Sequence, residues 1–184
     1  SGSATLLGPG SWSVISGNGD YNGDGKSDLL VRNANGDTRM WLMNGTTTTS
    51  SSVLLGPGSW NVIDGQGDYN GDGKSDLLVQ NSNGDTRMWL MDGTTTSSSS
   101  VLLGPGSWGV ADGHSDTNGD GKSDLVVQNS NGDTRLWLMN GTTTSSSTVL
   151  LGPGAWSTWQ TEQGGVVTGD AGANSLTGTT GNDQ

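Results

Sequence analysis

The chain has 184 residues, a formal net charge of −11, 33 glycines and no cysteine or phenylalanine. With only seven lysines and arginines it is a poor partner for nucleic acid, and it has no apolar run long enough for membrane insertion. No stretch keeps a helical period, so the glycine, serine and threonine content favours short strands and tight turns. Because cysteine is absent, the sequence does not indicate whether the protein works in an oxidising or a reducing compartment.

Three units of 48 residues follow one another, and each begins at a tryptophan. Partial strands are expected at both ends of this repeat domain, near Thr5–Leu7 and at Trp156. The predicted organisation is a leader or tag remnant at residues 1–4, a repeat domain at 5–159 with units at about 12–59, 60–107 and 108–155, and a Gly/Thr-rich tail at 160–184 that we expect to be disordered.

Each unit predicts four strands. In the first unit we expect strands at Trp12–Ile15, Asp28–Asn33, Thr38–Met43 and Thr46–Leu55, with two-residue turns at Asn35-Gly36 and Asn44-Gly45. The first turn would pair Val31 with Met40 and Leu29 with Leu42 on one face, and Leu30 with Trp41 and Arg32 with Arg39 on the other. Both faces are then largely apolar, so each sheet must be covered on both sides. Stacked four-stranded sheets of this kind are propeller blades.

An oxygen-rich segment stands between the first two strands of each unit. Asp20, Asn22, Asp24 and Asp28 occupy positions 1, 3, 5 and 9, and the carbonyl of Lys26 falls at position 7. Calcium takes about 6–8 oxygen ligands, whereas magnesium keeps its waters and is a poorer fit. The same pattern recurs at Asp68, Asn70, Asp72, Lys74 and Asp76, and at Asp116, Asn118, Asp120, Lys122 and Asp124. We therefore expect one calcium per repeat and about three per chain.

The competing interpretation is that these segments are only Asp/Asn/Gly turns, which are common between strands. The distribution of acidic residues favours the interpretation as metal sites. Nine of the 18 acidic residues lie in the three loops, where they would repel one another without cations. An EF-hand is not expected, because Val31 stands where its bidentate glutamate would be and a strand follows the loop.

The loop D-x-N-G-D-G-x-x-D-L and the downstream N-G-D-T-R-M-W-L-M-N-G resemble the FG-GAP/VCBS repeats of integrin-α-like β-propellers, over about residues 6–156. The resemblance implies an all-β fold of four-stranded blades with a calcium loop between the first two strands. Three units fall short of the roughly 4–8 blades of a closed propeller. Either the chain is an excerpt of a longer propeller or several chains complete one, so we expect self-association through the open ends.

Residues 169–177, G-D-A-G-A-N-S-L-T, resemble a degenerate RTX nonapeptide. This implies a secreted bacterial protein, exported by a type I route to the cell surface or the medium. A generic Gly/Thr tail is the alternative.

Arg39 and Trp41, with their copies Arg87, Trp89, Arg135 and Trp137, are candidates to line sugar sites between blades. The competing interpretation places the tryptophans in the blade core. His114 is expected to be a solvated turn residue. No nucleophile–base pair or acid pair is visible outside the loops, so we expect no enzyme. The predicted function is a calcium-binding, lectin-like or adhesive module with glycan partners. The alternative is a structural, self-assembling module with no ligand beyond calcium.

Overall fold

The computed structural model describes residues 12–58 and 60–153. Within them the chain is all-β, with three four-stranded antiparallel sheets and no helix, which confirms the predicted fold class. The described residues contain no helix that could cross a membrane. The expected leader, the partial strands near Thr5–Leu7 and Trp156, and the tail at 160–184 lie outside the described residues.

Each sheet is a meander in which strands adjacent in sequence are paired. Blade 1 contains β1 (Trp12–Ser16), β2 (Leu29–Asn33), β3 (Thr38–Asn44) and β4 (Thr47–Leu55). Blade 2 contains β5 (Asn61–Asp64), β6 (Leu77–Gln80), β7 (Thr86–Asp92) and β8 (Thr95–Leu103). Blade 3 contains β9 (Trp108–Ser115), β10 (Asp124–Asn129), β11 (Thr134–Asn140) and β12 (Thr143–Leu151).

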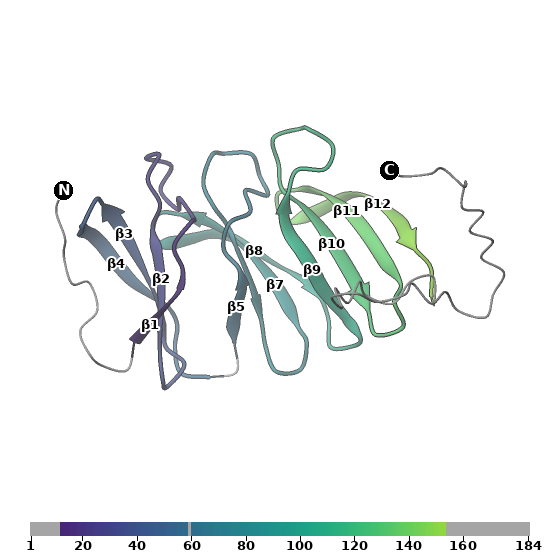
Figure 1. Cartoon of the computed structure of the whole chain (residues 1–184), viewed down its shortest axis with the longest axis horizontal. Coiled ribbons are helices and arrows are strands. Elements are labelled where there is room, and N and C mark those ends of the chain that lie inside the picture. The colour runs from purple at the N-terminus through teal and green to yellow at the C-terminus, as the bar shows by residue number, and fades with distance from the viewer. Residues whose placement is uncertain (1–11, 59, 154–184) are drawn as a thin grey trace, which may run out of the picture.

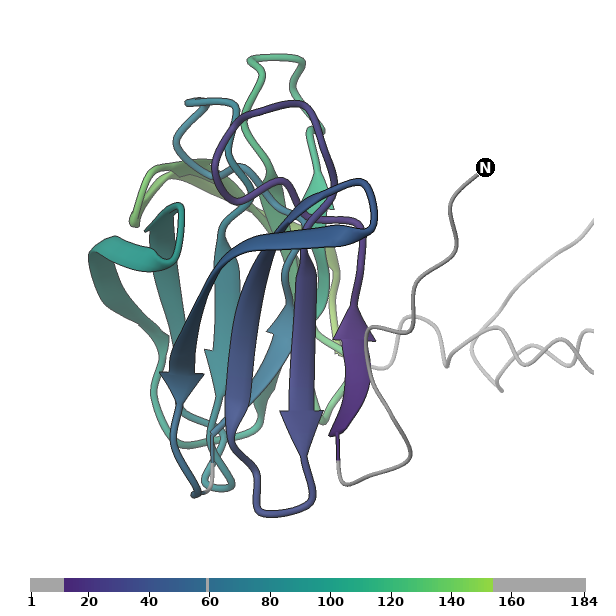
Figure 2. The same cartoon turned by 90° about the vertical axis from the view of Figure 1, so that its left-hand side faces the viewer.

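The three blades stand side by side in chain order and do not close into a ring (Figure 1). The oxygen-rich loops that join the first two strands of each blade lie along the same edge of the molecule. Figure 2, which looks from the blade 1 end, shows the sheets behind one another with these loops again together. The repeat therefore places three copies of one loop next to each other.

The predicted strand register is wrong by one residue. Leu30 pairs with Met40, and Leu29 pairs with Trp41. The β2–β3 turn has three residues rather than two, because the Asn33 amide donates to the carbonyl of Asp37 at 3.0 Å. Gly36 has a φ of 91°, which closes a three-residue hairpin loop. The second turn is also displaced, since Asn44 pairs with Thr47 and leaves Gly45-Thr46 as the turn.

Both sheet faces remain apolar in the observed register, as predicted. We call the face of a blade that meets the following blade its trailing face, and the opposite face its leading face. The trailing face of blade 1 packs against the leading face of blade 2, and blade 2 packs in the same way against blade 3. The first cluster joins Leu30, Met40 and Leu42 to Leu77, Val79 and Met91, and the second joins Leu78, Met88 and Leu90 to Leu125, Val127 and Met139. The hydrophobic core of the chain therefore lies between blades.

Candidate metal centre

The loop between β1 and β2 is wound around the carboxylate of Asp20. That carboxylate accepts hydrogen bonds from the amides of Gly23 at 2.8 Å and Gly25 at 2.7 Å. Both glycines have positive φ, 72° and 79°, a conformation that other residues adopt only with strain. The loops at Asp68 and Asp116 repeat these contacts at 2.7–2.9 Å. The loops are therefore three copies of one backbone structure.

The last carboxylate of each loop is buried beneath it. Asp28 accepts hydrogen bonds from the amides of Tyr21 at 2.9 Å and Met43 at 2.8 Å. It thus fastens the beginning of the loop to the end of β3. Asp76 and Asp124 occupy the same place in blades 2 and 3.

Two of these buried carboxylates, Asp28 and Asp76, lie in an unfavourable electrostatic environment. Burial raises the pKa of Asp76 to about 7, and the negative charges of Asp68 and Asp72 contribute to the rise. Burial also raises the pKa of Asp28, again with a contribution from its two loop carboxylates, Asp20 and Asp24. Desolvation and like charges both disfavour the ionised form. A cation bound within the loop would oppose both effects.

The upper part of the loop turns its oxygens toward its own chain. The Asn22 side chain accepts from the Asp24 amide at 3.1 Å, and Asp24 accepts from the Lys26 amide at 2.9 Å. The ammonium group of Lys26 lies 3.0 Å from the other Asp24 oxygen. Within residues 12–58 and 60–153, no three carboxylate or imidazole groups converge closely enough to hold a metal ion as they stand.

The donor set nevertheless fits calcium chemically, because every predicted ligand is a carboxylate, amide or carbonyl oxygen. The predicted ligands of each loop are close in sequence and share one short turn. An oxygen that accepts an amide hydrogen bond keeps a second lone pair for a cation, whereas the ammonium group of Lys26 competes with a cation for Asp24. Metal binding at these residues stays a prediction.

The arginines and tryptophans proposed as a ligand site are arranged differently from the sequence-based pairing. Arg39 lies over the ring of Trp12, 5.3 Å from its centre, and Arg87 lies over Trp60 at 5.2 Å. Arg135 repeats the arrangement over Trp108 at 5.0 Å. Trp89 and Trp137 lie under no arginine of the described residues and pack against the clusters between blades, as Trp60 and Trp108 also do. The aromatic partner of each arginine is thus the tryptophan that begins its blade.

Comparison with protein families identifies the repeat. The profile of the FG-GAP-like repeat matches residues 68–113 and 116–174, which together are more than half of the chain. The chain belongs to the FG-GAP-like repeat family. The related FG-GAP repeat profile matches residues 15–54, so all three blades are included. No curated protein and no solved structure matches the chain significantly.

FG-GAP repeat families are non-enzymatic structural and adhesion modules, typical of extracellular or surface proteins. The predictions of an FG-GAP-type repeat and of a β-propeller-like architecture are therefore confirmed.

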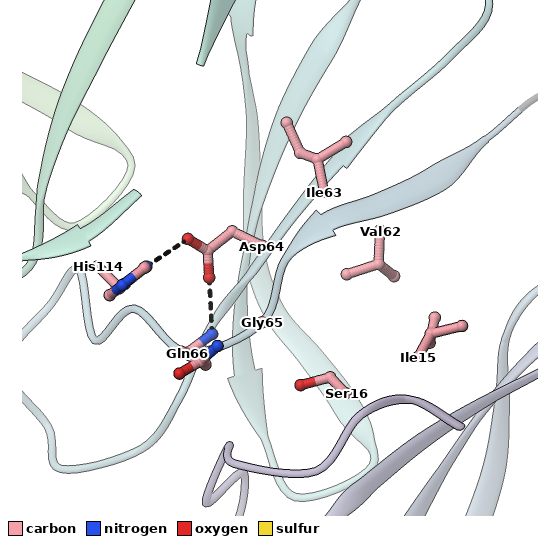
Figure 3. Close-up of a pocket in the computed structure, with 8 residues that line it drawn as sticks. All are labelled: Ile15, Ser16, Val62, Ile63, Asp64, Gly65, Gln66 and His114. Carbon is pink, nitrogen blue, oxygen red and sulfur yellow. Dashed lines mark hydrogen bonds and ion pairs between the residues drawn. The ribbon is translucent and has the colours of Figure 1, made fainter. Parts of the chain in front are cut away.

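The first strands of the FG-GAP repeats line a shallow hollow of about 180 Å³ (Figure 3). Ile15 of β1, Ile63 of β5 and His114 of β9 are among the residues around it. The His114 ring lies 3.0 Å from the carboxylate of Asp64, and this contact raises the pKa of His114. His114 therefore links blades 2 and 3. Its sequence position, in a slot held by Asn18 and Gln66 in the other repeats, gave no signal of this partner.

Proposed function

We propose that this FG-GAP repeat chain is a calcium-stabilised binding module of a secreted or surface protein, with a lectin-like or adhesive role. The observation that carries the proposal is the loop built three times over. Each copy places a buried aspartate, Asp28, Asp76 or Asp124, under a turn rich in oxygen ligands. Calcium is the cation whose ligand preferences match that set.

In this proposal calcium supplies positive charge to a cluster of carboxylates. Asp20, Asn22, Asp24 and the carbonyl of Lys26 would hold the ion, together with Asp28, and the other two loops would do the same. Asp28 also keeps its loop attached to the chain, since it accepts the amides of Tyr21 and Met43. Metal binding would therefore act on blade stability through this aspartate.

The ligand contacts are proposed at the arginine–tryptophan stacks. Trp60 packs against the cluster between blades 1 and 2, so the Arg87–Trp60 stack lies at the edge of that junction. The guanidinium of each stack can donate hydrogen bonds to sugar hydroxyls, and the edge of the indole beneath it offers an apolar contact. Three stacks would act together, and multivalency raises avidity by roughly 10²–10⁴ over a single site.

Thermal unfolding of EDTA-treated protein tests the metal. We expect millimolar calcium to raise the melting temperature and magnesium to have little effect. The triple variant Asp24→Ala, Asp72→Ala, Asp120→Ala should lose the calcium-induced rise. A matched control, Asp37→Ala, Asp85→Ala, Asp133→Ala, removes three carboxylates at the β2–β3, β6–β7 and β10–β11 hairpins and should keep it. A triple loop variant that still responds to calcium contradicts the site.

A glycan array tests the ligand. Binding that free sugar inhibits, and that Arg87→Ala weakens, supports the lectin-like role. Silence across the array, with the calcium response intact, favours the alternative of a structural, self-assembling module. The open ends of the blade array support that alternative. Secretion by a type I route, suggested by the RTX-like segment, belongs to the same proposal.

A further inference from the structure

The loops of neighbouring blades are joined by a repeated pair of hydrogen bonds. The Asp20 amide donates to the Ser75 hydroxyl at 3.1 Å, and the Ser75 amide donates to the Asp20 carbonyl at 2.7 Å. Asp68 and Ser123 make the same two bonds at 3.0 and 2.7 Å. Each blade thus presents an aspartate backbone to the serine of the blade that follows.

A further backbone hydrogen bond joins each pair of neighbouring blades. The Gly93 amide, in the turn after β7, donates to the carbonyl of Tyr21 at 2.8 Å. The Gly141 amide, in the turn after β11, donates to the carbonyl of Tyr69 at the same distance. The two junctions inside the chain are therefore copies of one interface, with the same contacts displaced by one repeat.

A buried tyrosine completes each internal junction. The Tyr21 hydroxyl donates to the Gly65 carbonyl at 2.8 Å, and the Tyr69 hydroxyl donates to the Gly113 carbonyl. Both phenols are fully buried. In blade 3 the corresponding residue is Thr117, which is exposed and turns its hydroxyl to Asp124 in its own blade.

The two ends of the array carry complementary halves of this interface. At the blade 1 end, Ser27 is exposed, whereas Ser123 is buried against the preceding blade. Lys26 is likewise more open, with 46% of its side chain accessible against 26% for Lys74. At the blade 3 end, Asp116 is exposed, and within the described ranges neither its amide nor its carbonyl makes the bonds found at Asp20 and Asp68.

We infer that a second copy of this chain docks its blade 1 on the trailing face of blade 3. In that contact Ser27 of the second copy takes the place of Ser75 and Ser123, and pairs with the backbone of Asp116. The Gly45 amide of the second copy donates to the Thr117 carbonyl, as Gly93 and Gly141 do within the chain. The inference extends an interface that the chain already makes twice, and it stands independently of the proposed ligand and metal.

Two copies joined in this way contain six blades. A head-to-tail contact forms a ring when its rotation closes, and six blades fall within the roughly 4–8 of known propellers. Two chains therefore form a closed ring of six blades. Thr117 makes the junction between chains weaker than those within a chain, because no phenol is present to reach the Gly17 carbonyl, the counterpart of Gly65 and Gly113.

The test is sedimentation velocity over a concentration series, in calcium and again in EDTA, with circular dichroism to verify the fold. We expect a reversible dimer. Ser27→Arg should weaken it by at least about tenfold, which corresponds to roughly 1.4 kcal/mol. Ser82→Arg is the matched control, since it adds the same charge at an exposed turn on the opposite edge of blade 2, and it should leave the dimer unchanged.

A substitution on the blade 3 side of the contact should strengthen the junction between chains. Thr117→Tyr restores the phenol and should tighten association about fivefold, the effect of one added hydrogen bond of roughly 1 kcal/mol. A monomer at every concentration overturns the inference. So does a dimer as sensitive to Ser82→Arg as to Ser27→Arg, or an assembly of more than two chains. If Thr117→Tyr does not fold, the comparison of Ser27→Arg with Ser82→Arg tests the inference by itself. Failure of the metal proposal would appear as an unchanged melting temperature in calcium, whereas failure of the dimer inference would appear in the sedimenting mass.

Discussion

At the scale of single residues, the junctions depend on glycines that leave room for a phenol. A Cβ on Gly65 would lie 2.6 Å from the Tyr21 hydroxyl and 3.3 Å from the side chains of Leu30 and Leu77. We expect Gly65→Ala to lower the free energy of unfolding by about 1–3 kcal/mol, as overpacking does in other cores. Urea unfolding measures it, with Gly104→Ala as control because a Cβ there meets nothing within 4 Å. Equal stability of the two variants contradicts this account.

The same pair of residues gives a coupling prediction. Tyr21→Phe removes the hydroxyl and leaves the buried Gly65 carbonyl without its donor, which should cost about 1–3 kcal/mol. It also removes the atom that an alanine at Gly65 would strike. The double variant should therefore be less destabilised than the sum of the two single variants, by at least about 0.5 kcal/mol. Strict additivity in a double-mutant cycle would show that the hydroxyl and the glycine do not interact.

At the scale of elements, the three-residue turn fixes the register of the β2–β3 hairpin. Gly36 has a φ of 91°, so Gly36→Ala should cost about 1 kcal/mol or more. Gly56→Ala, at an ordinary φ and in open space, is the matched control in the same blade and should be nearly neutral. Denaturant midpoints of the two variants supply the measurement. A neutral Gly36→Ala would mean that the turn relaxes to another form.

Strand positions were predictable because Asn-Gly or Asp-Gly pairs separate the second, third and fourth strands of each unit, and Gly-Pro-Gly ends the fourth. The register was not, since the same Asn35-Gly36 pair fits both a two-residue and a three-residue loop. What distinguishes them is a side-chain contact, in which Oδ1 of Asn33 accepts hydrogen bonds from the amides of Asn35 and Asp37, each at 2.9 Å. The arginine–tryptophan stacks were missed for a similar reason, because they depend on how β1 lies beside β2.

The candidate metal site was predictable as a pattern and not as a geometry. Spacing alone brings Asp20, Asn22 and Asp24 into one turn, and the structure confirms a single loop fold in all three repeats. The direction in which each oxygen points depends on its contacts with backbone amides and with Lys26. Spacing carries no information about those contacts. The double role of Asp28, which anchors the loop to β3, also requires knowledge of the fold.

At the scale of the whole molecule, stability comes from contacts between neighbouring blades, as in other repeat arrays. Met40 and Met88 are fully buried at the two internal junctions, whereas Leu136, their counterpart in blade 3, is only partly buried. The same side-chain truncation should therefore have different consequences at equivalent positions of the repeat. Equivalent residues of the near-identical blades therefore contribute differently to stability, because the trailing face of blade 3 has no following blade among the described residues.

Met88→Ala should lower the free energy of unfolding by about 2–5 kcal/mol at any protein concentration, since it opens a cavity between blades 2 and 3. Leu136→Ala should cost clearly less in dilute protein, where blade 3 ends the array. At concentrations that favour the dimer, Leu136→Ala should approach the cost of Met88→Ala, because a second copy then buries that face. Chemical unfolding at two concentrations, tens of fold apart, separates the cases. A Leu136→Ala cost that is independent of concentration would place the trailing face of blade 3 outside any interface between chains.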